Sequence, residues 1–248
     1  MFTPEDLPLV HESRPGTVAS DAPAVVLVHG RGTNERDLLP LGAQLPEELH
    51  VRSVRAPTTM PGAILVIRRS EQLHLVRPGP VHPRVRVRRP RVRTAIPGTT
   101  WTSRPAASTR ASPTQGFRRS PDLLHEFVDG AVDAYDPDPD RVGLLGFSQG
   151  AITSLSALLE RPDAYRWVVA LNGSLAAEHE DDADAAASKP VFVGCGAMDR
   201  IIPPERAERA ADRLVDAGAE VRFERYGVGH GTTPEEVTDV VAWVDERF

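Results

Sequence analysis

Three residues of this chain have the types and the chain order of a nucleophile, an acid and a base: Ser148, Asp199 and His230. Ser148 stands in the stretch GFSQG, which fits the pattern G-x-S-x-G and lies between a strand-like run and a helical pattern. A serine on such a sharp turn has its hydroxyl exposed, and the flanking glycines, Gly146 and Gly150, leave room for the turn. The helix N-terminus also favours negative charge that develops beside it. These features predict a nucleophilic serine rather than a simple glycine-serine loop.

A serine hydroxyl needs a base to take its proton, and His230 is the candidate. It lies in the glycine-flanked stretch YGVGHG, just before the last helical pattern. His29 is a rival base, but it precedes Ser148 in the chain, so we expect it to be a structural group. Asp199 follows the run PVFVGCG and would orient the base and stabilise its charged form. The alternative is that Asp199 is an ordinary surface residue of an Asp-rich chain.

Ester chemistry also needs two N–H groups that stabilise the oxyanion of the tetrahedral intermediate. We expect one from Gln149, the residue after the nucleophile, and the other from the loop HGRGTNERDLL, in which Arg31 follows the His-Gly pair. A simple glycine turn is the alternative for this loop.

The elements that must position these residues alternate between strand and helix along the chain. Helical apolar spacing marks residues 120–135, 149–160, 203–220 and 233–248, with a weaker pattern at 36–45. Apolar runs without that spacing predict strands near residues 24–30, 49–57, 141–148, 166–174, 190–196 and 220–226. This alternation predicts an α/β protein with a mostly parallel central sheet and helices on both faces.

Length and composition place the chain among globular proteins. With 248 residues, 40% of them hydrophobic, it can form one domain over residues 1–248. The acid- and proline-containing start does not resemble a signal peptide, and no segment is apolar for about 18 residues. A single cysteine, Cys195, excludes an internal disulfide. We therefore expect a cytoplasmic protein without a stable membrane anchor.

Charge is distributed unevenly along the chain. Residues 63–115 hold eleven arginines and one acid, Glu71, whereas the rest holds 34 acids and 18 basic residues, a balance of −16. Such an acidic surface repels nucleic acid, and its hydration in concentrated salt suggests a high-salt cytoplasm. A basic tether for nucleic acid is the alternative function of residues 63–115. Against it, residues 63–100 contain no Phe, Trp or Tyr on which bases could stack.

Four stretches together resemble the phospholipase/carboxylesterase family of small serine α/β-hydrolases, which includes the acyl-protein thioesterases. They are LVHGRGTNERDLLPL, DRVGLLGFSQGA, VFVGCGAMD and YGVGHG, and the similarity extends over residues 22–60 and 117–248. The resemblance implies an α/β-hydrolase fold without a cofactor or metal. It also implies Ser148, Asp199 and His230 as the catalytic triad, with oxyanion N–H groups from Arg31 and Gln149.

Residues 63–115 depart from the family, which keeps substrate-binding residues in this region. Moving the reading frame back by one nucleotide allows strings such as HASQPDAG that resemble the family's aromatic and acidic loop. We therefore interpret much of this Arg- and Pro-rich segment as an out-of-frame translation, poorly ordered in the protein.

The sequence thus predicts a serine carboxylic ester hydrolase, carboxylesterase- or lysophospholipase-like, acting on a small molecule through an acyl-enzyme. Two alternatives stay open: an acyl thioesterase, and a hydrolase-fold protein impaired by the disrupted loop. The natural substrate cannot be read from the sequence, and neither can the oligomeric state, a homodimer included.

Overall fold

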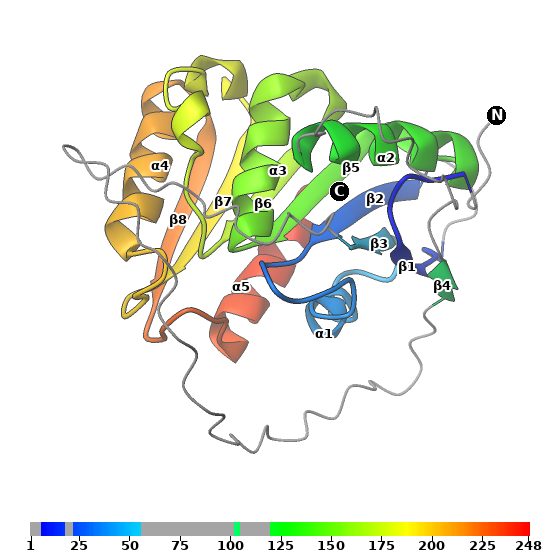
Figure 1. Ribbon diagram of the computed structural model, residues 1–248, viewed down its shortest axis with the longest axis horizontal. Coiled ribbons are helices and arrows are strands. Elements are labelled where there is room, and N and C mark those ends of the chain that lie inside the picture. The colour runs from blue at the N-terminus through cyan, green and yellow to red at the C-terminus, as the bar shows by residue number, and fades with distance from the viewer. Residues whose placement is uncertain (1–5, 18–21, 56–101, 105–119) are drawn as a thin grey trace, which may run out of the picture.

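The computed structural model describes residues 6–17, 22–55, 102–104 and 120–248, which Figure 1 shows as a ribbon. Within these residues eight strands form one sheet, in the order β4-β1-β3-β2-β5-β6-β7-β8. The strands are β1 (His11–Arg14), β2 (Ala22–Val28), β3 (His50–Val54), β4 (Thr102–Arg104), β5 (Pro137–Phe147), β6 (Trp167–Leu171), β7 (Pro190–Gly196) and β8 (Glu220–Tyr226). The α-helices are α1 (Leu39–Gly42), α2 (Ser120–Tyr135), α3 (Gln149–Glu160), α4 (Pro204–Asp216) and α5 (Pro234–Asp245), and three 3₁₀ helices are η1 (Pro162–Ala164), η2 (Ala177–His179) and η3 (Ala183–Ala186).

The sheet is mostly parallel, as the sequence predicts. Strands β3, β2, β5, β6, β7 and β8 pair in parallel with their neighbours, while β1 pairs antiparallel with both β3 and β4. Parallel strands joined by helices bring their carboxyl ends to one edge of the sheet. The residues that follow β2, β5 and β7 therefore meet there, which is where the sequence places its candidate residues.

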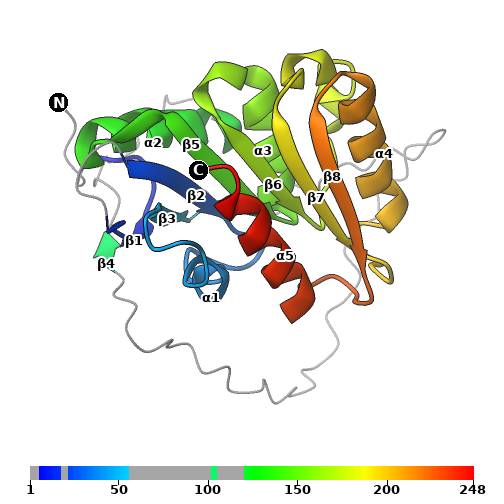
Figure 2. The same ribbon diagram turned by 180° about the vertical axis from the view of Figure 1, so that it is seen from behind.

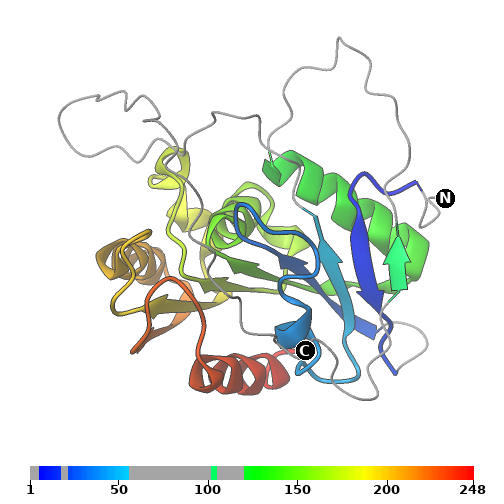
Figure 3. The same ribbon diagram turned by 60° about the horizontal axis from the view of Figure 1, so that its bottom comes forward.

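Helices cover both faces of the sheet. Figures 1 and 2 show α2, α3 and α4 on one face and α1 and α5 on the other, and Figure 3 shows the sheet between them. Each face has its own hydrophobic core because side chains alternate along a strand. In β2, Val26 and Val28 pack with the first set of helices, and Val25 and Leu27 with the second.

The local sequence explains where individual elements begin. α5 begins after Thr233, whose side chain accepts a hydrogen bond from the backbone N–H of Glu236 and so caps the helix. The helix predicted near residues 36–45 is shorter than expected: α1 contains four residues, with Pro40 in its first turn and Gly42 at its end. No helix in the described ranges is long and apolar enough to cross a bilayer.

Two strands at one edge of the sheet, β1 and β4, are not predicted by the sequence. β1 is missed because its residues, HESR, show no apolar pattern, although all four are buried. β4 is three residues long and falls within residues 63–115, the rest of which lies outside the described residues. The out-of-frame interpretation of that segment stays a prediction.

Candidate active site

Ser148 occupies a strained turn between β5 and α3. Its backbone dihedrals are φ 56° and ψ −117°, and α3 begins at the next residue. The flanking glycines are required by space: a Cβ on Gly146 would lie 2.3 Å from the carbonyl oxygen of Gly150, and one on Gly150 would lie 1.9 Å from that of Val28. Strain of this kind persists where the surroundings hold it, typically at functional sites. The structure therefore places Ser148 on the sharp strand-to-helix turn that the sequence predicts.

Two hydrogen bonds connect the three predicted catalytic residues. The Oγ of Ser148 lies 2.8 Å from Nε2 of His230, and Nδ1 of His230 lies 2.6 Å from Oδ2 of Asp199. An ionised carboxylate only accepts hydrogen bonds, so it fixes the proton of the imidazole on Nδ1. Nε2 then has a free lone pair directed at the serine hydroxyl. This arrangement can remove a proton from Ser148 as its oxygen attacks an electrophile.

Asp199 is held in place by backbone N–H groups of the loop that follows it. Its Oδ1 accepts hydrogen bonds from the N–H groups of Ile201, at 2.8 Å, and Ile202, at 3.1 Å. The side chain of Asp199 has no exposed surface, whereas that of His230 is 15% exposed. One carboxylate oxygen therefore anchors the acid while the other orients the base, and the base alone remains accessible from solvent.

The loop after β2 lies against the nucleophile. A Cβ on Gly30 would come within 3.3 Å of the Cβ of Ser148, so the loop and the serine are in close contact. The carbonyl oxygen of Gly30 accepts hydrogen bonds from His29 Nδ1, at 2.7 Å, and from the Thr33 hydroxyl, at 2.8 Å. His29 thus orders this loop, in agreement with the structural role predicted for it.

Two backbone N–H groups are available for an oxyanion. Across the described ranges, neither Arg31 nor Gln149 donates its backbone N–H to another group of the protein. Gln149 is also the first residue of α3, where N–H groups lack partners within the helix and the helix dipole favours negative charge. Gln149 follows the nucleophile directly, and Arg31 follows Gly30, which is in contact with Ser148; their role as oxyanion donors stays a prediction.

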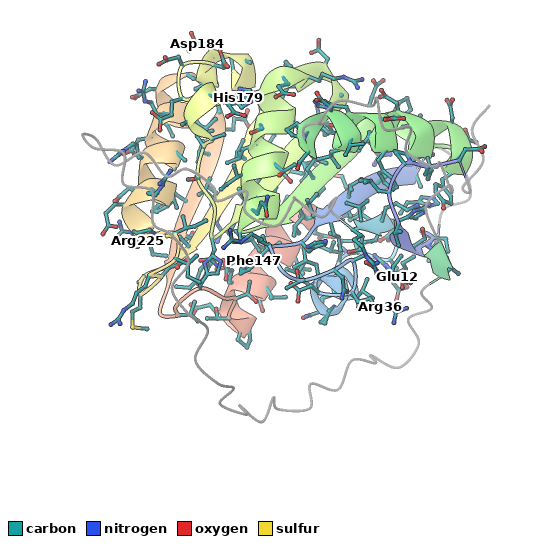
Figure 4. The ribbon with its side chains drawn as sticks, viewed as in Figure 1. Glu12, Arg36, Phe147, His179, Asp184 and Arg225 are labelled. Carbon is teal, nitrogen blue, oxygen red and sulfur yellow. The ribbon has the colours of Figure 1, made fainter. Side chains whose placement is uncertain are left out.

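The base is placed by contacts of its own loop. The ring of His230 packs on Phe147, with centroids 5.2 Å apart, and Figure 4 shows Phe147 at the end of its strand. A Cβ on Gly196 would lie 2.0 Å from the carbonyl oxygen of Gly229, so the His230 loop touches the end of β7 directly. Glycine at position 196 is what permits this approach.

Asn172 is a buried polar residue of this region that the sequence analysis did not identify. It follows β6, is fully buried, and hydrogen-bonds both the end of β7 and the His230 loop. Its signal in the sequence is weak: an asparagine in the stretch LNGS, at the carboxyl end of a predicted parallel strand.

Neither Cys195 nor a metal site competes with Ser148 in the described residues. Cys195 is 1% exposed, and desolvation raises the pKa of its thiol to about 11, so it is protonated at neutral pH. No group of three His, Cys, Asp or Glu side chains in the described ranges is arranged to hold a metal ion.

Several known proteins are similar in sequence to this chain. A family model for phospholipase/carboxylesterase proteins matches residues 93–246, a range that begins inside the Arg-rich segment. Acyl-protein thioesterase 1 of Gibberella zeae is 31% identical over 145 residues, which are 56% of this chain and 61% of that protein. The putative hydrolase MhqD of Bacillus subtilis is 24% identical over 224 residues, 90% of this chain and 93% of that protein. The match to the thioesterase thus spans less than two thirds of its length.

Solved structures share the fold over nearly the whole chain. The Bacillus cereus carboxylesterase superposes with a TM-score of 0.66 at 24% identity, covering 97% of this chain and 95% of that one. Esterase PE8 superposes with a TM-score of 0.68 at 20% identity, covering 98% and 100%. Acyl-protein thioesterase 2 of Zea mays gives 0.61 at 17% identity, covering 96% and 98%. The predicted α/β-hydrolase fold is confirmed.

Proposed function

Because the chain belongs to the phospholipase/carboxylesterase family, we propose that it is a serine hydrolase that cleaves carboxylic esters through an acyl-enzyme. The observation that carries this proposal is the pair of hydrogen bonds linking Asp199, His230 and Ser148. These residues act as acid, base and nucleophile, in the chain order expected for a serine on a strand-to-helix turn.

In the first half of the reaction, the Oγ of Ser148 attacks the ester carbonyl carbon as Nε2 of His230 takes its proton. The carbonyl oxygen becomes an oxyanion, which the backbone N–H groups of Arg31 and Gln149 stabilise. Collapse of this intermediate breaks the bond to the leaving alkoxide, which receives the proton from Nε2. The alcohol departs, and the acyl group remains on Ser148.

In the second half, water replaces the alcohol. His230 takes a proton from the water as its oxygen attacks the acyl carbon, and the same N–H groups stabilise the second oxyanion. Collapse breaks the bond to Oγ, and the proton on Nε2 returns to Ser148. Each step uses only groups of the chain and water, so the proposed mechanism requires no cofactor.

Exposed apolar side chains on both sides of Asp199 favour an apolar acyl group in a small substrate. Met198 is 62% exposed and Ile201 is 63% exposed, although large apolar side chains are usually buried. They border the loop that holds the acid, so an aliphatic acyl chain bound there would cover them.

Thioester hydrolysis is the second candidate function. It is favoured by the relative from Gibberella zeae, which is named as an acyl-protein thioesterase. The proposed steps are the same for a thioester, except that a thiolate leaves in place of an alkoxide. Ester and thioester substrates are therefore distinguished by kinetics rather than by the triad.

The experiment compares p-nitrophenyl butyrate with the matching thioester in concentrated KCl, using the wild-type chain and Ser148→Ala. We expect serine-dependent hydrolysis with a loss of about 10³- to 10⁶-fold in kcat on removal of the nucleophile. A higher kcat/KM for the thioester would assign the chain to the second candidate.

Circular dichroism provides the folding control for both proteins. Equal rates for the wild type and Ser148→Ala, with both folded, would refute the proposal. That result would favour the remaining alternative, a hydrolase-fold protein impaired in residues 63–115.

A further inference from the structure

Asn172 is a buried polar residue at the carboxyl end of a central strand. It follows the last residue of β6, has no exposed surface and adopts a φ of 51°, in the left-handed region. Asparagine tolerates that region better than other residues with a side chain. A buried amide in a strained conformation is costly unless the surroundings use all of its hydrogen-bonding groups.

The surroundings use both ends of the amide. The backbone N–H of Gly196 donates to Oδ1 at 2.8 Å, and Nδ2 donates to the carbonyl oxygen of Gly231 at 2.8 Å. The backbone N–H of Asn172 donates to the carbonyl oxygen of Gly194, also at 2.8 Å. The orientation of the amide is fixed, because its first partner can only donate and its second can only accept.

These partners lie next to the residues of the triad. Gly231 follows His230 directly, and the carbonyl oxygen of Gly196 accepts a hydrogen bond from the backbone N–H of Asp199 at 3.1 Å. The residue before Asn172, Leu171, accepts a hydrogen bond from the backbone N–H of Ser148 at 2.8 Å. One short segment therefore connects the backbones that carry the nucleophile, the acid and the base.

We propose that Asn172 is a positioning residue that sets the His230 loop at the right distance from Asp199 and Ser148. It touches none of the reacting atoms and acts through the backbone that follows the base, at Gly231, and the backbone that precedes the acid, at Gly196. This inference rests on the proposed serine-hydrolase function. A misplacement of about 1 Å in a catalytic group can cost about 100-fold in rate, so a spacer of this kind has a measurable effect.

The chemistry of the amide makes the proposal specific. In Asn172→Asp, a carboxylate would face the carbonyl oxygen of Gly231 and repel it. When that Asp is protonated, its O–H can donate to Gly231 while its other oxygen accepts from Gly196, which restores the native pattern. Asn172→Ala loses both hydrogen bonds at every pH. The two variants should therefore differ in how their activity depends on pH.

We expect Asn172→Asp to lower kcat about 10- to 100-fold at pH 8, with KM changed less than twofold. The ratio of its kcat to that of the wild type should rise as pH falls, whereas the ratio for Asn172→Ala should stay low and flat. Because Asn172→Asp has the native shape when protonated, it keeps the test valid if Asn172→Ala does not fold. A pH-independent, wild-type kcat for either folded variant would overturn the proposal.

Tyr165→Phe is the matched control for a merely structural loss. Tyr165 is 1% exposed and its hydroxyl hydrogen-bonds Nδ1 of His125 at 2.7 Å, away from the triad. This variant should lower thermal stability and leave kcat within twofold of the wild type. If Tyr165→Phe and Asn172→Asp lower kcat equally, position 172 has no special role in catalysis.

A spectroscopic measurement separates failure of this proposal from failure of the proposed function. We expect the proton between His230 Nδ1 and Asp199 to give a far-downfield ¹H NMR signal in the wild type, because the two atoms that share it lie 2.6 Å apart. Without any substrate, we expect this signal in Ser148→Ala and its loss or displacement in Asn172→Ala. An unchanged signal in Asn172→Ala would contradict the proposal even if the chain hydrolyses no tested ester.

Discussion

The sheet buries polar side chains at two places, and their hydrogen bonding differs. One place is the carboxyl ends of β5, β6 and β7, which we call the catalytic edge. There, the buried side chains of Ser148, Asn172 and Asp199 all take part in hydrogen bonds. At the β1–β3 edge, some buried polar atoms have no hydrogen-bond partner among the described residues, including Ser13 Oγ and Ser53 Oγ. The hydrogen bonding at the first place is typical of a functional site. At the second place, the fold tolerates the energetic cost of burying polar atoms without partners.

The β1–β3 edge also buries a cation. Arg52 is 4% exposed, its guanidinium lies 4.0 Å from the ring centroid of Tyr135, and desolvation lowers its pKa to about 10. It donates to the carbonyl oxygens of Arg14 and Val51. Figure 4 marks a more conventional pair nearby, in which Arg36 Nε donates to Glu12 at 2.9 Å. The polar side chains at the catalytic edge thus form one connected network of hydrogen bonds. Those at the β1–β3 edge form separate pairs instead.

The largest effect predicted by this comparison concerns Asp199. In Asp199→Asn, Oδ1 can still accept from the backbone, but an NH₂ group would face His230 and favour the wrong tautomer. We expect kcat for an activated ester to fall about 10³- to 10⁴-fold with little change in stability.

Asp182→Asn is the matched control for Asp199→Asn. Asp182, like Asp199, hydrogen-bonds a histidine: its Oδ2 lies 3.0 Å from Nδ1 of His179. This pair lies outside the catalytic network. Its kcat should stay within twofold of the wild type. Similar losses in the two variants would mean that the catalytic edge is not special.

Glu236 is the exception at the catalytic edge, and it gives the second prediction. It has no exposed surface, and desolvation raises its pKa to about 7. The nearby backbone N–H of Thr233 offsets part of this rise in pKa, although within the described residues neither carboxylate oxygen has a hydrogen bond of good geometry. Because the folded-state pKa lies above the unfolded one, the stability contributed by this group is complete below about pH 4 and is lost as pH rises through about 7.

We therefore expect Glu236→Gln to stabilise the chain more at pH 8 than at pH 5, with a difference on the order of 2–3 kcal/mol. The amide has the same shape without the charge, and the helix cap at Thr233 uses the backbone of residue 236, so it stays intact. Urea unfolding at the two pH values measures the effect. An equal change in stability at both would show that Glu236 does not titrate in this range.

Ser53→Ala tests the other edge and has the smallest expected effect. Ser53 is fully buried and its Oγ has no hydrogen-bond partner in the part of the chain that the structure describes, so removing the hydroxyl should raise the free energy of unfolding by about 1 kcal/mol. Denaturant midpoints measure this change. Tyr165→Phe, which removes a partnered hydroxyl, should have the opposite sign; destabilisation by Ser53→Ala would show that its hydroxyl is satisfied after all.

The sequence predicts the apolar strands and the turn of the nucleophile, but it does not predict the buried polar strand at the β1–β3 edge. Strand β7 and the second half of β5 are buried on both faces and appear as continuous apolar runs, and the glycines around Ser148 mark its turn. β1 could not be predicted, because its four buried residues are polar and its partners are distant in the chain. The role proposed for Asn172 could not be predicted either, since it depends on three segments meeting in space.

The most direct test of the central claim is labelling with a fluorophosphonate, which an activated serine attacks with loss of fluoride. Our account predicts one label per chain, on the peptide that contains Ser148, with no labelling in Ser148→Ala and much slower labelling in Asp199→Asn. A folded wild-type chain that stays unlabelled, or a Ser148→Ala variant labelled at the wild-type rate, would contradict it.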